Sequence, residues 1–192
     1  MILPITVIGH PTLKKVAQDI DKDYPNLGEL IKNMYETMHH TEGIGLAAPQ
    51  VNKSIRLFII DATPYEETFK ETKGFKKTFI NAKIVNRTGD IVTMDEGCIS
   101  IPGIREDVDR EETITIQYYD ENWEYHEEEY SGIIARIIQH EYDHIDGILF
   151  TDRISPLKKM LLRTKIRNIS TGKTKAFYKV LLPPVKGKKR VL

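Results

Sequence analysis

The 192-residue sequence contains one cysteine, so it cannot form an internal disulfide. It has no uninterrupted apolar run that approaches the roughly 18 residues of a membrane-spanning helix. The apolar residues 1–9 lack a basic segment before them and are broken by Pro4, so we expect no signal peptide. Hydrophobic residues make up 40% and charged residues 29% of the chain, which excludes collagen-like, low-complexity and wholly disordered proteins. We expect one folded domain over 1–192, located in the cytoplasm.

The net charge is zero, but the charges are distributed unevenly along the chain. Residues 153–192 contain 13 Lys or Arg and no acidic residue, whereas residues 1–152 contain 15 basic and all 28 acidic residues. An acidic body with a basic C-terminal helix and tail from about residue 155 indicates a polyanionic partner such as the ribosome. We expect no membrane contact and no specific DNA. The alternative is a solvated helix face followed by a frayed terminus.

Hydrophobic periodicity and turn residues predict the elements of the first two thirds of the chain. Apolar residues at helical spacing predict a helix over 25–40, and an apolar run predicts a strand at 55–60. The polar stretch 61–76 is typical of a surface loop. The same signals predict a short helix at 10–17, strands at 78–85 and 90–94 around a turn at 87–89, and a hairpin of strands at 113–119 and 123–130.

Two further helices follow the hairpin. Ser131 is the expected N-cap of a helix that continues through His144. Ser155 and Pro156 are expected to begin a final helix of about a dozen residues, because Pro is well tolerated in a first turn. The predicted class is therefore α+β, with mixed or antiparallel strands packed around a central helix and a further helix near the C-terminus.

The central helix carries two histidines one turn apart. Residues at i and i+4 share a helix face, so His140 and His144 can bind one metal ion. Glu141 would lie near that ion at a different angle, which suits a base that acts on metal-activated water. Isoleucines at 133, 134, 137 and 138 indicate a buried helix, where ionisable groups are costly without a metal or partners. The central helix is thus predicted to bind metal; the alternative is two unrelated histidines on a core helix.

A hydrolytic metal site commonly has three protein ligands. No His follows His144 and no Glu follows Glu141, so the downstream third ligands of metzincin-type and thermolysin-like enzymes are missing, and Asp146 and Asp152 are the downstream carboxylates. Cys98 is the strongest upstream candidate, because a divalent cation stabilises a thiolate. A lone cysteine can instead be a small buried hydrophobic residue.

Three segments together resemble the signature motifs of the peptide deformylase family. They are Gly43-Ile-Gly-Leu-Ala-Ala-Pro-Gln50, Glu96-Gly-Cys-Ile-Ser100 and Gln139-His-Glu-Tyr-Asp-His144. The resemblance covers nearly the whole chain. Ile99 stands where many members have Leu, and the loop 61–76 is longer than a minimal member requires. Neither departure removes a catalytic group.

The resemblance implies a hydrolase that removes the formyl group from the N-terminal formyl-methionine of new polypeptides and releases formate, a step of N-terminal processing in protein biosynthesis. It implies one divalent metal held by Cys98, His140 and His144. Ferrous iron is the usual ion, with zinc, nickel or cobalt also able to bind. Coordination chemistry alone favours zinc for this ligand set and cannot decide between zinc and iron.

The resemblance also implies a role for each remaining site residue. Glu141 would carry the proton from water to the leaving amine, and the Gln50 side chain and the Ile99 backbone N–H would stabilise the oxyanion. The residues implied to bind substrate are Gly43 and Gly45, which would pair with its backbone, Ile44 and Ile137, which would wall the methionine pocket, and Arg105, which would lie near the bound peptide. The alternatives are close packing of the two glycines against the helix at 25–40, a turn cap for Gln50, plain core for the two isoleucines and a surface role for Arg105. Glu96 and Asp143 are candidates to orient ligands or to pair with Arg110.

Two other functions are compatible with parts of the sequence. A metallopeptidase of the zincin type would also use His140, Glu141 and His144, but it requires a downstream third ligand. A non-catalytic module that binds nucleic acid or the ribosome would account for the basic C-terminal region. It would leave the metal-ligand pattern without a purpose.

Overall fold

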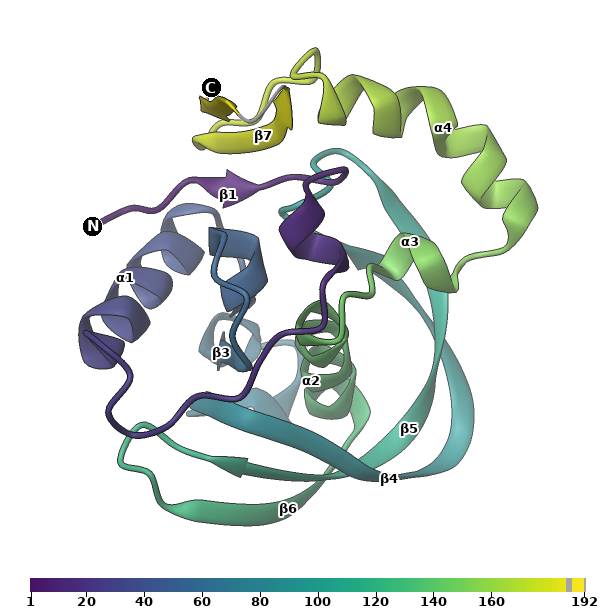
Figure 1. Ribbon diagram of the computed structural model, residues 1–192. Coiled ribbons are helices and arrows are strands. Elements are labelled where there is room, and N and C mark those ends of the chain that lie inside the picture. The colour runs from purple at the N-terminus through teal and green to yellow at the C-terminus, as the bar shows by residue number, and fades with distance from the viewer. Residues whose placement is uncertain (186–187, 192) are drawn as a thin grey trace.

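A five-stranded antiparallel sheet, in the order β2-β3-β4-β5-β6, curves around helix α2 in the computed structural model (Figure 1). The structure describes residues 1–185 and 188–191. The strands are β2 (Gly45–Ala47), β3 (Leu57–Asp61), β4 (Lys76–Gly97), β5 (Arg105–Tyr119) and β6 (Tyr125–Ser131), and the helix is α2 (Gly132–Ile145). The predicted α+β class with a central helix is confirmed.

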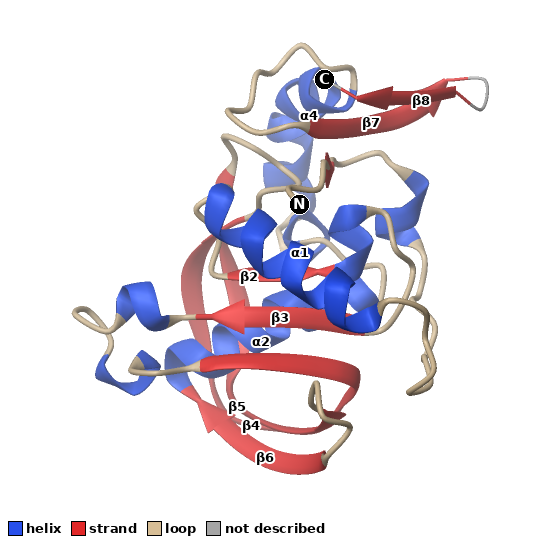
Figure 2. Cartoon of the chain, turned by 90° about the vertical axis from the view of Figure 1, so that its left-hand side faces the viewer, coloured by secondary structure: helices blue, strands red, loops and turns tan. Residues whose placement is uncertain are grey.

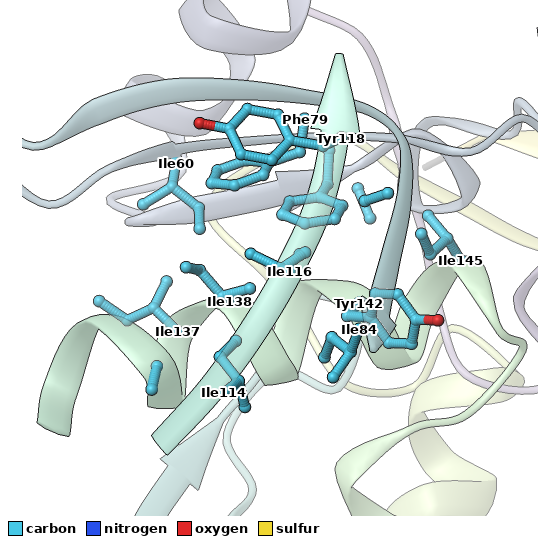
Figure 3. Packing of buried hydrophobic residues seen from close by; sticks show 14 of the residues in the cluster. Ile60, Phe79, Ile84, Ile114, Ile116, Tyr118, Ile137, Ile138, Tyr142 and Ile145 are labelled. Atoms are coloured by element: carbon cyan, nitrogen blue, oxygen red, sulfur yellow. The ribbon is translucent and has the colours of Figure 1, made fainter. Parts of the chain in front are cut away.

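Strand β3 is buried on both faces because helices cover both sides of the sheet at this point. Its side chains alternate: Leu57 and Ile59 pack toward α1 (Leu27–His40), whereas Phe58 and Ile60 pack toward α2. Figure 2 shows α1 in front of β2 and β3, with α2 behind them. Figure 3 shows how α2 contributes Ile137 and Ile138 to the cluster that Ile114 and Ile116 of β5 complete. The central helix is therefore held in place by apolar packing along its length.

The two strands predicted at 78–85 and 90–94 are wrong in one respect, because they form a single strand of 22 residues. The expected turn at 87–89 is a β-bulge, since the register with β5 shifts between Thr88 and Ile91. Gly89, with φ of 79°, takes the left-handed conformation that this bulge requires. Strand β5 also begins at Arg105, earlier than the predicted hairpin strand, and it pairs with β4 as far as Gly97.

A second sheet joins the two ends of the chain, in the order β1-β7-β8 (Figure 1). Strand β1 (Ile5–Thr6) pairs in parallel with β7 (Val180–Val185), and β7 pairs antiparallel with β8 (Lys188–Val191). The alternative of a frayed basic terminus is therefore wrong over the described residues. The backbone after the last helix is instead fixed by hydrogen bonds to β1.

The helices predicted at 25–40, at 131–144 and from 155 are present with small changes at their ends. Helix α4 (Pro156–Ser170) begins as expected, with Ser155 Oγ accepting a hydrogen bond from the Lys158 backbone N–H at 3.3 Å. Ser131 occupies the N-cap position of α2, but its side chain makes no capping hydrogen bond, which corrects the expectation for this residue. A short helix, α3 (Phe150–Arg153), connects α2 to α4.

The predicted helix at 10–17 is a single 3₁₀ turn, η1 (Pro11–Lys14). A second such turn, η2 (Ala48–Val51), follows β2. The expected surface loop at 61–76 contains two more, η3 (Thr63–Tyr65) and η4 (Lys70–Thr72). Among the described residues, none of the helices combines the length and apolar character needed to cross a membrane.

Candidate active site

The end of β4 and one face of α2 bring Cys98, His140 and His144 together. Cys98 Sγ lies 3.3 Å from His144 Nε2. One donor atom from each of the three side chains lies within 4.8 Å of the other two. The i, i+4 spacing places both imidazoles on the face of α2 that meets the turn after β4. Residues distant in sequence thus present one sulfur and two ring nitrogens to a common point.

Glu96 and Arg110 hold His140 in its orientation. Glu96 Oε2 lies 2.8 Å from His140 Nδ1, so Nε2 is the ring nitrogen that remains available to a metal. Arg110 is 2% exposed and donates to both Glu96 oxygens, at 2.6 and 2.9 Å. It also donates to Asp143 Oδ2 at 2.8 Å. A bidentate guanidinium–carboxylate pair of this kind fixes the carboxylate and, through it, the imidazole.

Two further arginines join this buried network, and the sequence analysis missed both. Arg136 donates to Glu96 Oε1 and to the Val108 carbonyl, each at 2.9 Å. Arg153 donates to both oxygens of Asp143, at 2.6 and 2.5 Å. Burial opposes the ionisation of Glu96, but hydrogen bonds from Arg110 and His140 outweigh burial and hold the pKa of Glu96 far below its usual range. Arg136 could have been noticed in the sequence, because it is a charged residue within the isoleucine-rich helix.

The donor set and its surroundings fit a divalent metal ion. One thiol and two imidazoles are ligands for zinc and for ferrous, nickel or cobalt ions. Burial, together with the charges of His140 and Arg110, lowers the pKa of His144 well below 6.5, so this ring is neutral and able to ligate. Burial alone would lower the pKa of His140, but its hydrogen bonds to Cys98 and Glu96 raise it well above 6.5. The neighbours of His140 therefore favour a positive charge at this point, and a metal cation bound there would take the place of the ring proton.

Glu141 is buried, and its Oε2 has no hydrogen-bond partner among the described residues. Burial raises the pKa of Glu141 to about 7, and the negative charges of Glu96 and Asp143 act in the same direction. A carboxyl group that titrates near neutrality can both accept and release a proton. Its close neighbour is Gly45, where a Cβ would lie 2.4 Å from Glu141 Oε1. Glycine at this position therefore leaves the space that the carboxylate occupies.

Gln50 and Ile99 lie next to Cys98. Gln50 Oε1 accepts a hydrogen bond from the Ala47 N–H at 2.8 Å, so the side-chain amide is oriented. Its Nε2 points to Ser100 Oγ at 3.2 Å and to Cys98 Sγ at 3.4 Å. Among the described residues, the Ile99 backbone N–H makes no hydrogen bond. An unpartnered backbone N–H and an oriented side-chain amide thus lie beside Cys98.

These groups line a cleft of about 770 Å³. The sequence-predicted residues in its walls are Gly43, Ile44, Gly45, Gln50, Cys98, Ile99, Arg105, Ile137, His140 and Glu141. Strand β2 lies at the edge of the sheet and pairs with β3 on one side, so the other side of Gly45 faces the cleft. Arg105 lies at the rim, with its Nε 2.5 Å from Asp95 Oδ2.

The cleft also has walls that the sequence analysis did not predict. Tyr65 and Phe69 come from the loop 61–76, and residues 175–178 come from the segment after α4. Neither stretch has a residue pattern that marks a binding site. Their position becomes evident only from the folded chain.

Known proteins are similar to this chain over most of its length. A model of the polypeptide deformylase family matches residues 2–160. The chain belongs to the peptide deformylase family. Relatives named peptide deformylase from Christiangramia forsetii and Flavobacterium psychrophilum are each 54% identical to it over 193 residues, covering 97% of this chain and 98% and 100% of the relatives.

Solved structures of peptide deformylases have the same fold. The enzyme from Legionella pneumophila aligns with a TM-score of 0.79 and 33% identity, covering 92% of this chain and 99% of that chain. The enzyme from Thermotoga maritima aligns with a TM-score of 0.73 and 38% identity, covering 81% and 99%. As a member of this family, the chain is a metal-dependent hydrolase that removes the formyl group from the N-terminal formyl-methionine of new polypeptides.

Proposed function

We propose that residues 1–192 form one catalytic domain in which Cys98, His140 and His144 hold a single divalent metal and Glu141 transfers the proton of the deformylation reaction. The main support is the position of the Glu141 carboxylate. It is buried without a partner beside a sulfur and two imidazoles. A buried carboxylate with only a structural role would be paired with a cation or hydrogen-bonded. A general acid–base function accounts for its position.

The bound metal supplies Lewis acidity and lowers the pKa of a water molecule. Glu141 accepts a proton from the attacking water and later delivers it to the nitrogen as the C–N bond of the formamide breaks. The products are formate and a free amino terminus. Gln50 Nε2 and the Ile99 N–H donate hydrogen bonds to the oxygen that becomes negative during attack. Each such donor is typically worth about 10²–10³ in rate.

The substrate is a nascent formyl-methionyl peptide, bound in extended form along β2. Gly45 begins β2 at the free edge of the sheet, and Gly43 precedes it in the wall of the cleft, which suits pairing of this stretch with a peptide strand. Ile44 and Ile137 supply apolar walls for the methionine side chain. Arg105, which is 64% exposed, lies at the rim of the cleft where the following residues of the peptide would leave it.

We further propose ferrous iron as the metal in the cell, with zinc, nickel or cobalt able to occupy the same ligands. Metal analysis of protein purified without oxygen tests this assignment. A ferrous thiolate site should lose activity in air. Activity that never decays under aerobic conditions would exclude iron.

Formate release from a formyl-Met dipeptide, measured before and after chelation, tests the function itself. We expect chelation to abolish release and added Fe²⁺ or Ni²⁺ to restore it. An unformylated peptide with internal peptide bonds serves as the second substrate. Cleavage of internal bonds in the unformylated peptide, with no formate released from the dipeptide, would favour a metallopeptidase and overturn the proposal.

We propose a cytoplasmic location and a ribosome contact through the basic face of α4, where formylated chains emerge. Arg163 and Lys165 are exposed on this helix, whereas Lys158 and Lys159 pair with Glu106 and Asp152. The double change Arg163→Glu and Lys165→Glu should reduce cosedimentation with ribosomes at low salt. Formate release from the dipeptide should stay unchanged. Equal cosedimentation of both proteins would contradict the ribosome contact.

A further inference from the structure

The segment that follows α4 returns to the catalytic cleft. It lies beyond residues 2–160, which the family model matches, yet Lys175, Phe177 and Tyr178 line the cleft. The segment is anchored at its end, where the Ile5 N–H donates to the Lys179 carbonyl at 2.9 Å and β7 begins to pair with β1. Figure 1 shows β7 beside β1, which fixes the position of this returning chain. These residues are therefore held against the site by the second sheet.

Tyr178 makes a specific contact with the turn that carries Cys98. Its hydroxyl donates to the Ile99 carbonyl at 2.7 Å. The side chain is partly buried and packs against two of the apolar clusters, one of which also contacts Cys98 and the other Ile99. The hydroxyl thus reaches the backbone next to the metal-ligating sulfur from a part of the chain 79 residues away.

The turn at 98–100 is held by one hydrogen bond on each of its carbonyl groups. The Cys98 carbonyl accepts from the Ile101 N–H at 2.8 Å, and the Ser100 carbonyl accepts from the Ile8 N–H at 2.9 Å. The Ile99 carbonyl between them accepts from Tyr178. Because the peptide planes on both sides of the Ile99 Cα are fixed in this way, the direction of the unpartnered Ile99 N–H is fixed as well.

We propose that Tyr178 is a positioning residue for deformylation, which acts by holding the turn that presents the Ile99 N–H to the reacting carbonyl. This inference rests on the function proposed above. It assigns the segment after α4 to the active site, in addition to any role of the basic surface in docking. The hydroxyl is bonded to a backbone carbonyl, so its effect passes through the backbone of residues 98–100.

The variant Tyr178→Phe tests the proposal, since it removes the hydroxyl and keeps the ring that packs against the core. The matched control is Tyr24→Phe, because Tyr24 packs against the same apolar cluster at a place away from the cleft. We expect amide hydrogen exchange of the peptide spanning 98–101 to rise by roughly 2- to 10-fold in Tyr178→Phe, as the loss of one hydrogen bond implies. We expect kcat for the formyl-Met dipeptide to fall by about 10-fold, less than for complete loss of an oxyanion donor.

KM and metal content should stay within about 2-fold of the wild type, because the substrate-binding edge and the ligands are unchanged. The control should match the wild type in exchange and in kcat. Unchanged exchange at 98–101, or faster exchange with unchanged kcat, would overturn the positioning role. The exchange measurement does not depend on activity, so a wild-type protein that releases no formate would contradict the proposed function separately.

Discussion

The space beside Glu141 leaves no room for a side chain at position 45. A Cβ there would lie 2.4 Å from Oε1 and 2.7 Å from Cδ of Glu141, so a methyl group must displace the carboxylate. The position of the Glu141 carboxylate thus depends on the absence of a side chain at position 45. The same glycine belongs to the sheet edge on which the peptide is proposed to bind, which couples substrate pairing to the position of the proton-transfer group.

Replacing Gly45 with Ala should therefore lower kcat for formyl-Met peptides by about 10²-fold, because a displacement near 1 Å of a catalytic group has an effect of this size. Metal content should be unchanged. The matched control is Gly28→Ala, where nothing lies within 4 Å of the added Cβ. Because Gly28 lies in α1, this control should keep full activity and gain up to about 1 kcal/mol of stability. A fully active Gly45→Ala protein would contradict the geometry.

Glu141 itself can be tested without altering its shape. The change Glu141→Gln keeps the size of the side chain and removes its ability to accept a proton. We expect turnover to fall by about 10²–10⁴-fold, the usual contribution of a general acid–base group. Metal analysis of the purified variant should give the wild-type content, since Glu141 is outside the proposed ligand set. Loss of metal together with activity would instead indicate that Glu141 is a ligand.

At the scale of elements, the β5–β6 hairpin carries a hydrogen-bonded charge cluster around Glu128. Lys77 Nζ contacts both Glu128 oxygens, at 2.8 and 2.7 Å, and Tyr118 donates to Oε2 at 2.5 Å. Tyr130 donates to the same oxygen. Although burial favours the neutral acid, these bonds lower the pKa of Glu128 from 4.5 to about 2. The ionised form of Glu128 thus joins strand β4 to the hairpin.

A lowered pKa in the folded state gives this contact a defined pH dependence. Its stabilisation is fully present above the unfolded-state value of 4.5 and is lost as the pH falls toward 2. The variant Glu128→Gln should therefore be less stable than the wild type at pH 7, and the difference should shrink between pH 5 and pH 2.5. Urea unfolding at several pH values measures it. The neighbouring exposed Glu129, changed to Gln, is the control; a constant difference for Glu128→Gln would contradict the assignment.

The helices could be predicted from local sequence, whereas the β-bulge and strand β7 could not. The helices at 25–40, 131–144 and 155 onward follow from periodicity and caps, which are local. The sequence around Gly89 predicts a turn, because a glycine in a polar stretch is typical of both turns and β-bulges. The structure has a bulge because β5 continues to pair with β4 on both sides of this point. Strand β7 contains two prolines and a basic context, and its partner β1 lies at the other end of the chain. Non-local pairing was thus the missing information.

The residues of the candidate site also differ in whether local sequence predicts them. The histidine pair and Glu141 follow from helical spacing, and Cys98 follows from the absence of other third ligands. Gln50 and Ile99 came from resemblance to the family, because no periodicity marks them. Tyr178, in contrast, acts through its hydroxyl on a backbone carbonyl far away in sequence. A contact of that kind leaves no pattern in the residues around it.

Across the molecule as a whole, the donor atoms of the metal site belong to elements that are held in place by sheet pairing and by the hydrophobic core. Cys98 follows the long strand β4, and both histidines lie on a helix packed into the core. His140 is also bonded to Glu96, which belongs to a buried network with Arg110 and Asp143. We therefore expect the site to keep its shape without the metal, and the metal to add stability to a chain that is already folded.

This arrangement predicts the effect of metal removal on stability. A ligand that binds only the folded state stabilises it by about 2.7 kcal/mol when its concentration is 100 times its Kd. In a chain of this size, this corresponds to a loss of roughly 5–10 °C in Tm on chelation. Calorimetry and near-ultraviolet circular dichroism of loaded and chelated protein test both parts: Tm should fall, while the tertiary signal at 25 °C should persist. Cys98→Ser, which replaces the proposed thiolate ligand with a hydroxyl, should bind metal weakly and show a much smaller shift on chelation. Loss of the tertiary signal at 25 °C would mean that the metal assembles the site, because the network around Arg110 would then be too weak to hold the ligands alone.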